Sequence, residues 1–119
     1  MEVTTARVVN STPIELVTLS YEIVLENLKE AIECVNDNNE INISISKDFV
    51  KDLSQALDMK YEISKDLKSL YTYVIGLMIN AEITKDKNRK LNCLNESKHI
   101  LEKLYSSFKQ ISDNENTLS

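Results

Sequence analysis

Apolar residues recur at steps of three and four positions along most of this chain of 119 residues. In the first such stretch they are Val17, Tyr21, Val24 and Leu28, and this spacing places side chains on one face of an α-helix. The whole chain has one glycine and one proline, far fewer than the turns of a β-sandwich or barrel require. The pattern therefore predicts an all-α fold.

The first predicted helix spans residues 12–36. Thr12 is placed as its N-cap, Pro13 takes the first helical position, and Glu15 completes a capping box. The helix is expected to end in the run of asparagine and aspartate at 36–39, because these side chains compete for the backbone and favour turns.

The second segment allows two interpretations. Ile41, Ile43 and Ile45 alternate as in a strand, so a short edge strand is one alternative. A helix over 44–58 is the preferred prediction, since no partner strand is evident elsewhere. Its apolar face would consist of Ile45, Phe49, Leu53, Ala56 and Leu57.

Two further helices are predicted over 61–84 and 89–111. Their core stripes would be Ile63, Leu67, Leu70, Val74, Leu77 and Ala81, with Tyr71 and Met78 beside them, and then Leu94, Leu101, Leu104, Tyr105, Phe108 and Ile111. Short polar turns between four amphipathic helices predict an antiparallel four-helix bundle with up-down topology. It would form one domain over 12–111, with a flexible segment at 1–11 and a disordered tail at 112–119.

The charge balance and hydropathy restrict the partners of the chain. The formal net charge is −5, whereas nucleic-acid surfaces and anionic membranes attract clustered lysine and arginine. No run of about 18 apolar residues is present to span a bilayer, and residues 1–9 have no signal-peptide core. We therefore expect a cytoplasmic protein that neither binds nucleic acid nor inserts into a membrane.

The residues that enzymes use are sparse and scattered. The only histidine, His99, falls on the polar side of its helix, and no Glu-x-x-His motif of a di-iron bundle occurs. Cys34 and Cys93 lack metal-ligand spacing. One disulfide between them is possible, but reduced thiols acting as small hydrophobes are preferred. We expect no enzyme, no cofactor and no metal site.

Some apolar residues lie off the core stripes. In the first helix these are Leu16, Leu19 and Ile23; in the third they are Ile75, Ile79 and Ile83, with Tyr61 and Tyr73 also off the stripe. One interpretation is structural: a neighbouring helix, or the N-terminal segment with Val3, Val8 and Val9, covers them. The other is a groove that receives an apolar helix from a partner.

Several motifs then appear in a recognisable order. They are Ser11-Thr12-Pro13-Ile14-Glu15-Leu16 with Leu19 and Tyr21, then Leu57-Asp58, then Glu62-Ile63, Leu67, Leu70-Tyr71-x-Tyr73, Ala81 and Lys85-Asp86, and finally Phe108-Lys109-Gln110-Ile111. In this order the chain resembles the FliS family of flagellar secretion chaperones over residues 11–111. It departs from that family in lacking an aromatic residue before Tyr21 and in having Met59-Lys60-Tyr61 where a Gly-Gly is usual.

The resemblance implies a function. Proteins of that family bind the C-terminal segment of flagellin in the cytoplasm, prevent its premature polymerisation and deliver it to the flagellar type III export gate. Carried over to this chain, the expected flagellin contacts are Leu16, Leu19 and Ile23, followed by Ile75, Ile79 and Tyr73. Two alternatives remain: a helical export chaperone or adaptor for a different flagellar client, and a self-associating structural bundle.

Overall fold

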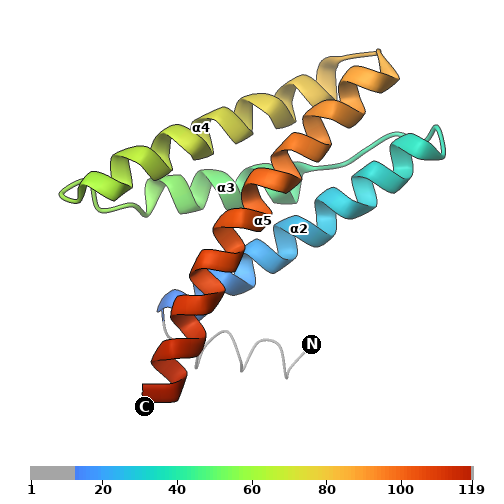
Figure 1. Ribbon diagram of the computed structural model, residues 1–119. Helices are drawn as coiled ribbons and strands as arrows, with labels where there is room; N and C mark the ends of the chain where they lie inside the picture. Colours follow the sequence, from blue (N-terminus) through green and yellow to red (C-terminus); the bar gives the residue numbers. More distant parts are fainter. Residues whose placement is uncertain (1–12, 119) are drawn as a thin grey trace.

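The protein forms a bundle of long helices connected by short turns (Figure 1). The computed structural model describes residues 13–118, with side chains from 15 to 111 and at 113 and 114. In this range the helices are α2 (Pro13–Asn36), α3 (Ser44–Gln55), α4 (Glu62–Ile83) and α5 (Lys87–Leu118). The predicted all-α antiparallel bundle is confirmed. Residues 13–118 include no strand, so the alternative of an edge strand is wrong.

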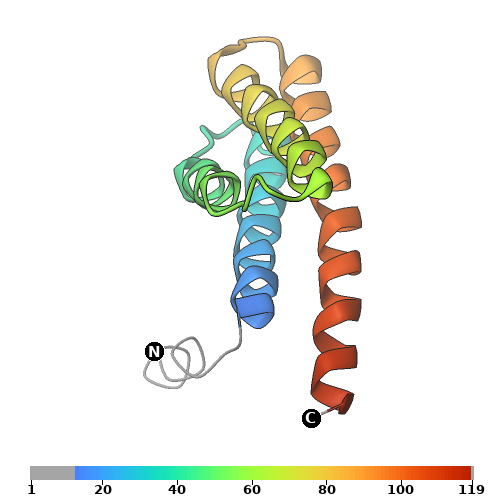
Figure 2. The same cartoon turned by 90° about the vertical axis from the view of Figure 1, so that its left-hand side faces the viewer.

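Each helix packs mainly on two others. α2 contacts α5 and α3, and α4 likewise contacts α5 and α3. Figure 2 shows α2 and α5 running side by side, with α3 beside α2 and α4 above α3. α3 therefore lies between α2 and α4. The proposed flexible segment at 1–11 and the N-cap at Thr12 lie outside the described residues.

The core is built from the predicted stripe of α2 and its counterparts on the other helices. Tyr21, Val24 and Leu28 of α2 are completely buried, so the spacing of apolar residues located the inward face of this helix correctly. The hydroxyl oxygens of Tyr21 and Tyr71 lie 2.6 Å apart and join α2 to α4 through the core. The remaining buried hydrophobic residues are Ala31, Val35, Ile43, Val50, Val74, Met78, Ala81, Cys93, Leu94 and Leu101.

The buried face of α4 is rotated from the predicted one. Tyr71 and Met78 are buried, whereas Leu70 is 38% exposed and Ile63 is 66% exposed. Figures 1 and 2 show the reason: α5 crosses α4 at an angle, and the first half of α4 extends away from it. In this first half of α4, Ser64 and Tyr71 are buried, and Ile63 and Leu70 of the predicted stripe stay exposed.

The last helix is longer than expected. α5 continues to Leu118, where the sequence predicted a helix end at 111 and a disordered tail over 112–119. No glycine or proline interrupts residues 87–118, and Lys109 and Asp113 form an i,i+4 ion pair at 3.6 Å across the predicted end. Propagating an existing helix requires little further stabilisation.

The second half of α5 is held on α2 by aromatic contacts. Phe108 stacks on Tyr21, with 5.6 Å between the ring centroids. One turn earlier, the Tyr105 hydroxyl donates a hydrogen bond to Glu22 Oε1 at 3.1 Å. These contacts lie beyond the region where α5 packs on α4, in the part of the helix that Figures 1 and 2 show projecting past α3 and α4.

Local hydrogen bonds set two further helix boundaries. α3 ends at Gln55, three residues before the predicted end at 58, and the Asp58 carboxylate then accepts a hydrogen bond from the Lys60 amide in a tight turn. α5 starts at Lys87 rather than 89, because the Asp86 carboxylate accepts hydrogen bonds from the amides of Asn88 and Arg89.

Candidate binding surface

Clusters of catalytic or ligating side chains are missing from the described part of the chain. In that part, no three His, Cys, Asp or Glu residues come together as a metal site would require. His99 is exposed, and both Cys34 and Cys93 are free thiols. Of the helices in residues 13–118, none has the length and apolar character needed to cross a membrane. A candidate site must therefore be sought among exposed apolar residues.

Two adjoining hollows follow the seam between α2 and α3. One is lined by Leu16, Val17 and Ser20 of α2 together with Phe49, Asp52, Leu53 and Ala56 of α3. The other is lined by Glu22, Ile23, Glu26, Asn27 and Glu30 of α2 and by Ile45 of α3. Because the two helices are antiparallel, the hollows succeed one another along the seam, and we call them together the α2–α3 groove.

Large apolar side chains are left exposed in this groove. Leu16 is 36% exposed, Ile23 is 44% exposed, and Ile45 on the opposite wall is 53% exposed. Phe49 and Leu53 are half-buried, with their inner surfaces packed on the core. A single exposed leucine or isoleucine is common on protein surfaces, but several that line one hollow indicate an interaction site.

The groove exists because α3 is buried on an unexpected face. Its fully or nearly buried residues are Ser46, Val50 and Ser54, one position away from Ile45, Phe49 and Leu53, which the sequence predicted to face the core. Small serine side chains let α3 approach its neighbours closely, and the large residues then point along the seam toward α2. Ile45, Phe49 and Leu53 were therefore not predicted as groove residues. The one sequence signal for the inward face was the pair of serines eight positions apart, Ser46 and Ser54.

Polar contacts fix the start of α3 against the middle of α2. The Ser46 hydroxyl lies 2.6 Å from Asn27 Oδ1 and 3.3 Å from the Val24 carbonyl oxygen. The Asn27 amide donates to the Asn42 carbonyl oxygen at 3.1 Å. These bonds satisfy a buried hydroxyl and hold the end of the groove near Ile45 and Ile23 in one geometry.

The other site residues proposed from the sequence lie in different places. Leu19 is half-buried and lines neither hollow of the groove. Glu82 of α4 forms a 2.6 Å ion pair with Lys47 of α3, so this side of α4 faces α3. Ile75 and Ile79 lie on the same side, because they precede Glu82 by seven and three residues. Ile79 is 42% exposed and Ile75 is half-buried. These two residues therefore face the α3–α4 seam, across α3 from Leu16 and Ile23.

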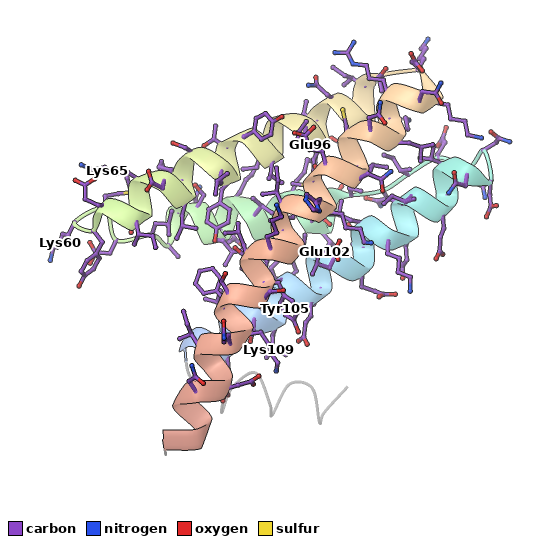
Figure 3. All side chains as sticks on the ribbon, in the orientation of Figure 1. Lys60, Lys65, Glu96, Glu102, Tyr105 and Lys109 are labelled. Carbon is purple, nitrogen blue, oxygen red and sulfur yellow. The ribbon has the colours of Figure 1, made fainter. Side chains whose placement is uncertain are left out.

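Tyr73 faces α5. Its hydroxyl donates a hydrogen bond to Glu96 Oε1 at 2.5 Å, although the side chain is half exposed. This bond to a carboxylate raises the pKa of Tyr73 above its usual value. Figure 3 shows Glu96 on α5 where that helix passes α4. Tyr73 is thus separated from both seams of α3, and the six proposed residues form three surfaces instead of one.

Comparison with known proteins identifies the family. The family model described as "Flagellar protein FliS" matches residues 2–115, which is nearly the whole chain. A comparison with curated proteins gives no match. FliS proteins are chaperones and not enzymes, and they act in the cytoplasm. An antiparallel helical bundle with an exposed apolar groove suits such a role, and the chain belongs to the FliS family of flagellar export chaperones, which bind flagellin.

Proposed function

We propose that the α2–α3 groove binds the C-terminal segment of flagellin as an amphipathic helix. Leu16 and Ile23 would be the main contacts on α2, with Leu19 at the edge of the groove and Ile45, Phe49 and Leu53 on the opposite wall. Ile75, Ile79 and Tyr73 would make secondary contacts, where the partner continues around the bundle. The observation behind this proposal is the row of exposed apolar residues that lines both hollows of the groove.

An amphipathic helix suits this groove for a physical reason. Its apolar residues, at steps of three and four, could occupy the two hollows in succession, while its polar face stays in water. A partner that folds on binding loses conformational entropy, which lowers the net affinity and keeps the complex reversible. Reversible binding is what a chaperone needs if its client must later be released.

The proposed occupancy also explains how the chaperone would act. The same apolar stripe of flagellin that enters the groove would otherwise pair with other flagellin subunits, so covering it prevents premature polymerisation. The complex would then be delivered to the type III export gate. The bundle presents further exposed apolar residues outside the groove, such as Met59 and Ile63, so a second contact is sterically available while flagellin is bound.

The double variant Leu16→Glu/Ile23→Glu tests the site. We expect it to bind a synthetic C-terminal segment of flagellin on the order of 100-fold more weakly, because carboxylates would replace two anchors in an apolar hollow. Isothermal titration calorimetry measures the affinity, and circular dichroism follows the helix gained by the peptide. Both side chains are at least one-third exposed, so the thermal stability of the free protein should change little.

A matched control is Ile83→Glu, since Ile83 is 71% exposed and does not line the groove. This variant should bind the segment with wild-type affinity. Unchanged binding by the double variant would contradict the proposed site. A concentration-dependent oligomer in light scattering that dissociates in the double variant would instead favour the self-associating bundle.

A further inference from the structure

The α2–α3 groove has charges of one sign. The titratable residues that line its two hollows are Glu22, Glu26, Glu30 and Asp52, and no lysine, arginine or histidine lines either hollow. Three of the four follow one another along α2 beside Ile23, and Asp52 stands on the α3 wall beside Phe49 and Leu53. The groove therefore has an apolar floor bordered by these four carboxylates, which we call the acidic rim.

The lysines nearest the groove lie at the contacts between other pairs of helices. Lys29 of α2 and Lys98 of α5 line the neighbouring hollow between α2 and α5, which Glu22 and Glu26 also border. Lys47 of α3 forms its ion pair with Glu82 of α4, at 2.6 Å, and Lys51 follows it by one turn on the same side of α3. The two hollows of the groove therefore contain no base, and Glu30 and Asp52 border neither lysine of the α2–α5 hollow.

Three of the four acidic groups are available to a partner. Glu22 accepts the hydrogen bond from Tyr105 of α5, whereas Glu26, Glu30 and Asp52 form no ion pair with any described residue. A helix laid in the groove would exclude water beside these carboxylates, which strengthens their interaction with its charges. Opposite charges on the partner would be attracted and like charges would be repelled.

We infer that the groove selects an amphipathic helix whose apolar stripe is flanked by lysine or arginine. This inference rests on the proposed function, because it describes the flagellin segment that the same groove would accept. The apolar floor supplies the contact area, and the acidic rim sets the orientation of the partner and discriminates against segments with acidic flanks. The net charge of −5 adds a weaker attraction over the whole surface.

Two synthetic helical peptides test this inference. They share one apolar stripe and differ only in its flanking residues, which are all lysine in one and all glutamate in the other. We expect the lysine peptide to bind at least about tenfold more tightly at low salt, the effect of a few partly exposed ion pairs. The difference should largely disappear near 1 M salt, where the screening length is about 3 Å. Fluorescence anisotropy at several salt concentrations measures both affinities.

A pair of variants separates the rim from the overall charge. Glu26→Gln, Glu30→Gln and Asp52→Asn together should remove most of the preference for the lysine peptide. The control, Glu33→Gln with Asp37→Asn and Asp66→Asn, changes the net charge equally at exposed positions outside the groove. It should keep the preference. An equal loss in both triple variants would overturn the inference, because the attraction would then come from net charge alone.

The outcomes also distinguish this inference from the proposed function. If both peptides bind equally well and Leu16→Glu/Ile23→Glu abolishes both, the groove is a helix site and the charge selection is overturned. If the lysine peptide binds with the expected preference but the C-terminal segment of flagellin does not displace it, the selection stands and the proposed client fails. Binding of the lysine peptide that is insensitive to Leu16→Glu/Ile23→Glu overturns the inference, since the peptide would lie elsewhere.

Discussion

Replacing Leu28 by alanine will lower the free energy of unfolding by about 3 kcal/mol, the middle of the range for a buried leucine. Leu28 is completely buried in the core cluster, between Val24 and Ala31 on the inward face of α2. Alanine removes its apolar contacts and leaves a cavity that long, packed helices fill only in part. Urea denaturation followed by circular dichroism measures the change.

The matched control is Leu16→Ala in the same helix. Leu16 is 36% exposed at the groove, so its truncation should cost about 1 kcal/mol or less. The two variants should therefore separate stability from binding: Leu28→Ala weakens the fold, and Leu16→Ala weakens binding of the flagellin segment. Equal losses of stability would contradict the assignment of Leu28 to the core and Leu16 to the surface.

Alkaline pH will destabilise the bundle through the Tyr21–Tyr71 pair. Burial raises the pKa of both hydroxyls above their usual value, so the native state keeps protons that the unfolded chain releases near pH 10. The stabilisation is complete below that pH and is lost as the pH rises above it. The expected slope is about 1.4 kcal/mol per pH unit for each tyrosine that stays protonated.

The double variant Tyr21→Phe/Tyr71→Phe removes this contribution. Its free energy of unfolding should fall less steeply than that of the wild type above about pH 10, in urea titrations at closely spaced pH values. All other ionisable groups are the same in both proteins, so their contribution largely cancels in the comparison. Tyr61→Phe is the control, because this side chain is 62% exposed. Parallel pH profiles for the wild type and the double variant would contradict the prediction.

Single replacements in this pair should behave differently from the double one. Tyr21→Phe leaves the Tyr71 hydroxyl buried without its 2.6 Å partner, and an unsatisfied buried hydroxyl costs about 1–3 kcal/mol. Removing both hydroxyls in Tyr21→Phe/Tyr71→Phe leaves no unpaired polar group. The losses of stability in the two single variants should therefore not add up in the double variant. The pair is the one hydrogen bond described between α2 and α4, which makes it a direct link across the core.

Local features of the sequence predicted α2 almost completely. Its stripe of Tyr21, Val24, Leu28, Ala31 and Val35 is buried as expected, and the helix ends at Asn36 where the polar turn begins. Such agreement is possible because helical periodicity and turn residues act within a few positions of one another. The order of motifs also pointed to the family that the later comparison identified.

Only the α2 wall of the candidate groove was predicted from the sequence. Leu16 and Ile23 were proposed because they lie off the stripe of α2, but the opposite wall of Ile45 and Phe49 was assigned to the core. A short helix with serines at 46 and 54 can bury either face. Which face turns inward depends on how closely its neighbours approach, and periodicity does not report that.

The sequence by itself determined that this chain forms four amphipathic helices and which side of α2 faces inward, since both follow from interactions between residues three or four positions apart. Only the tertiary structure decided that α3 turns its large residues toward α2, that Ile63 and Leu70 of α4 stay exposed, and that the acidic residues of α2 and α3 share one groove. These features depend on the crossing of helices distant in sequence, whose geometry is set by the shapes of all the packed side chains together.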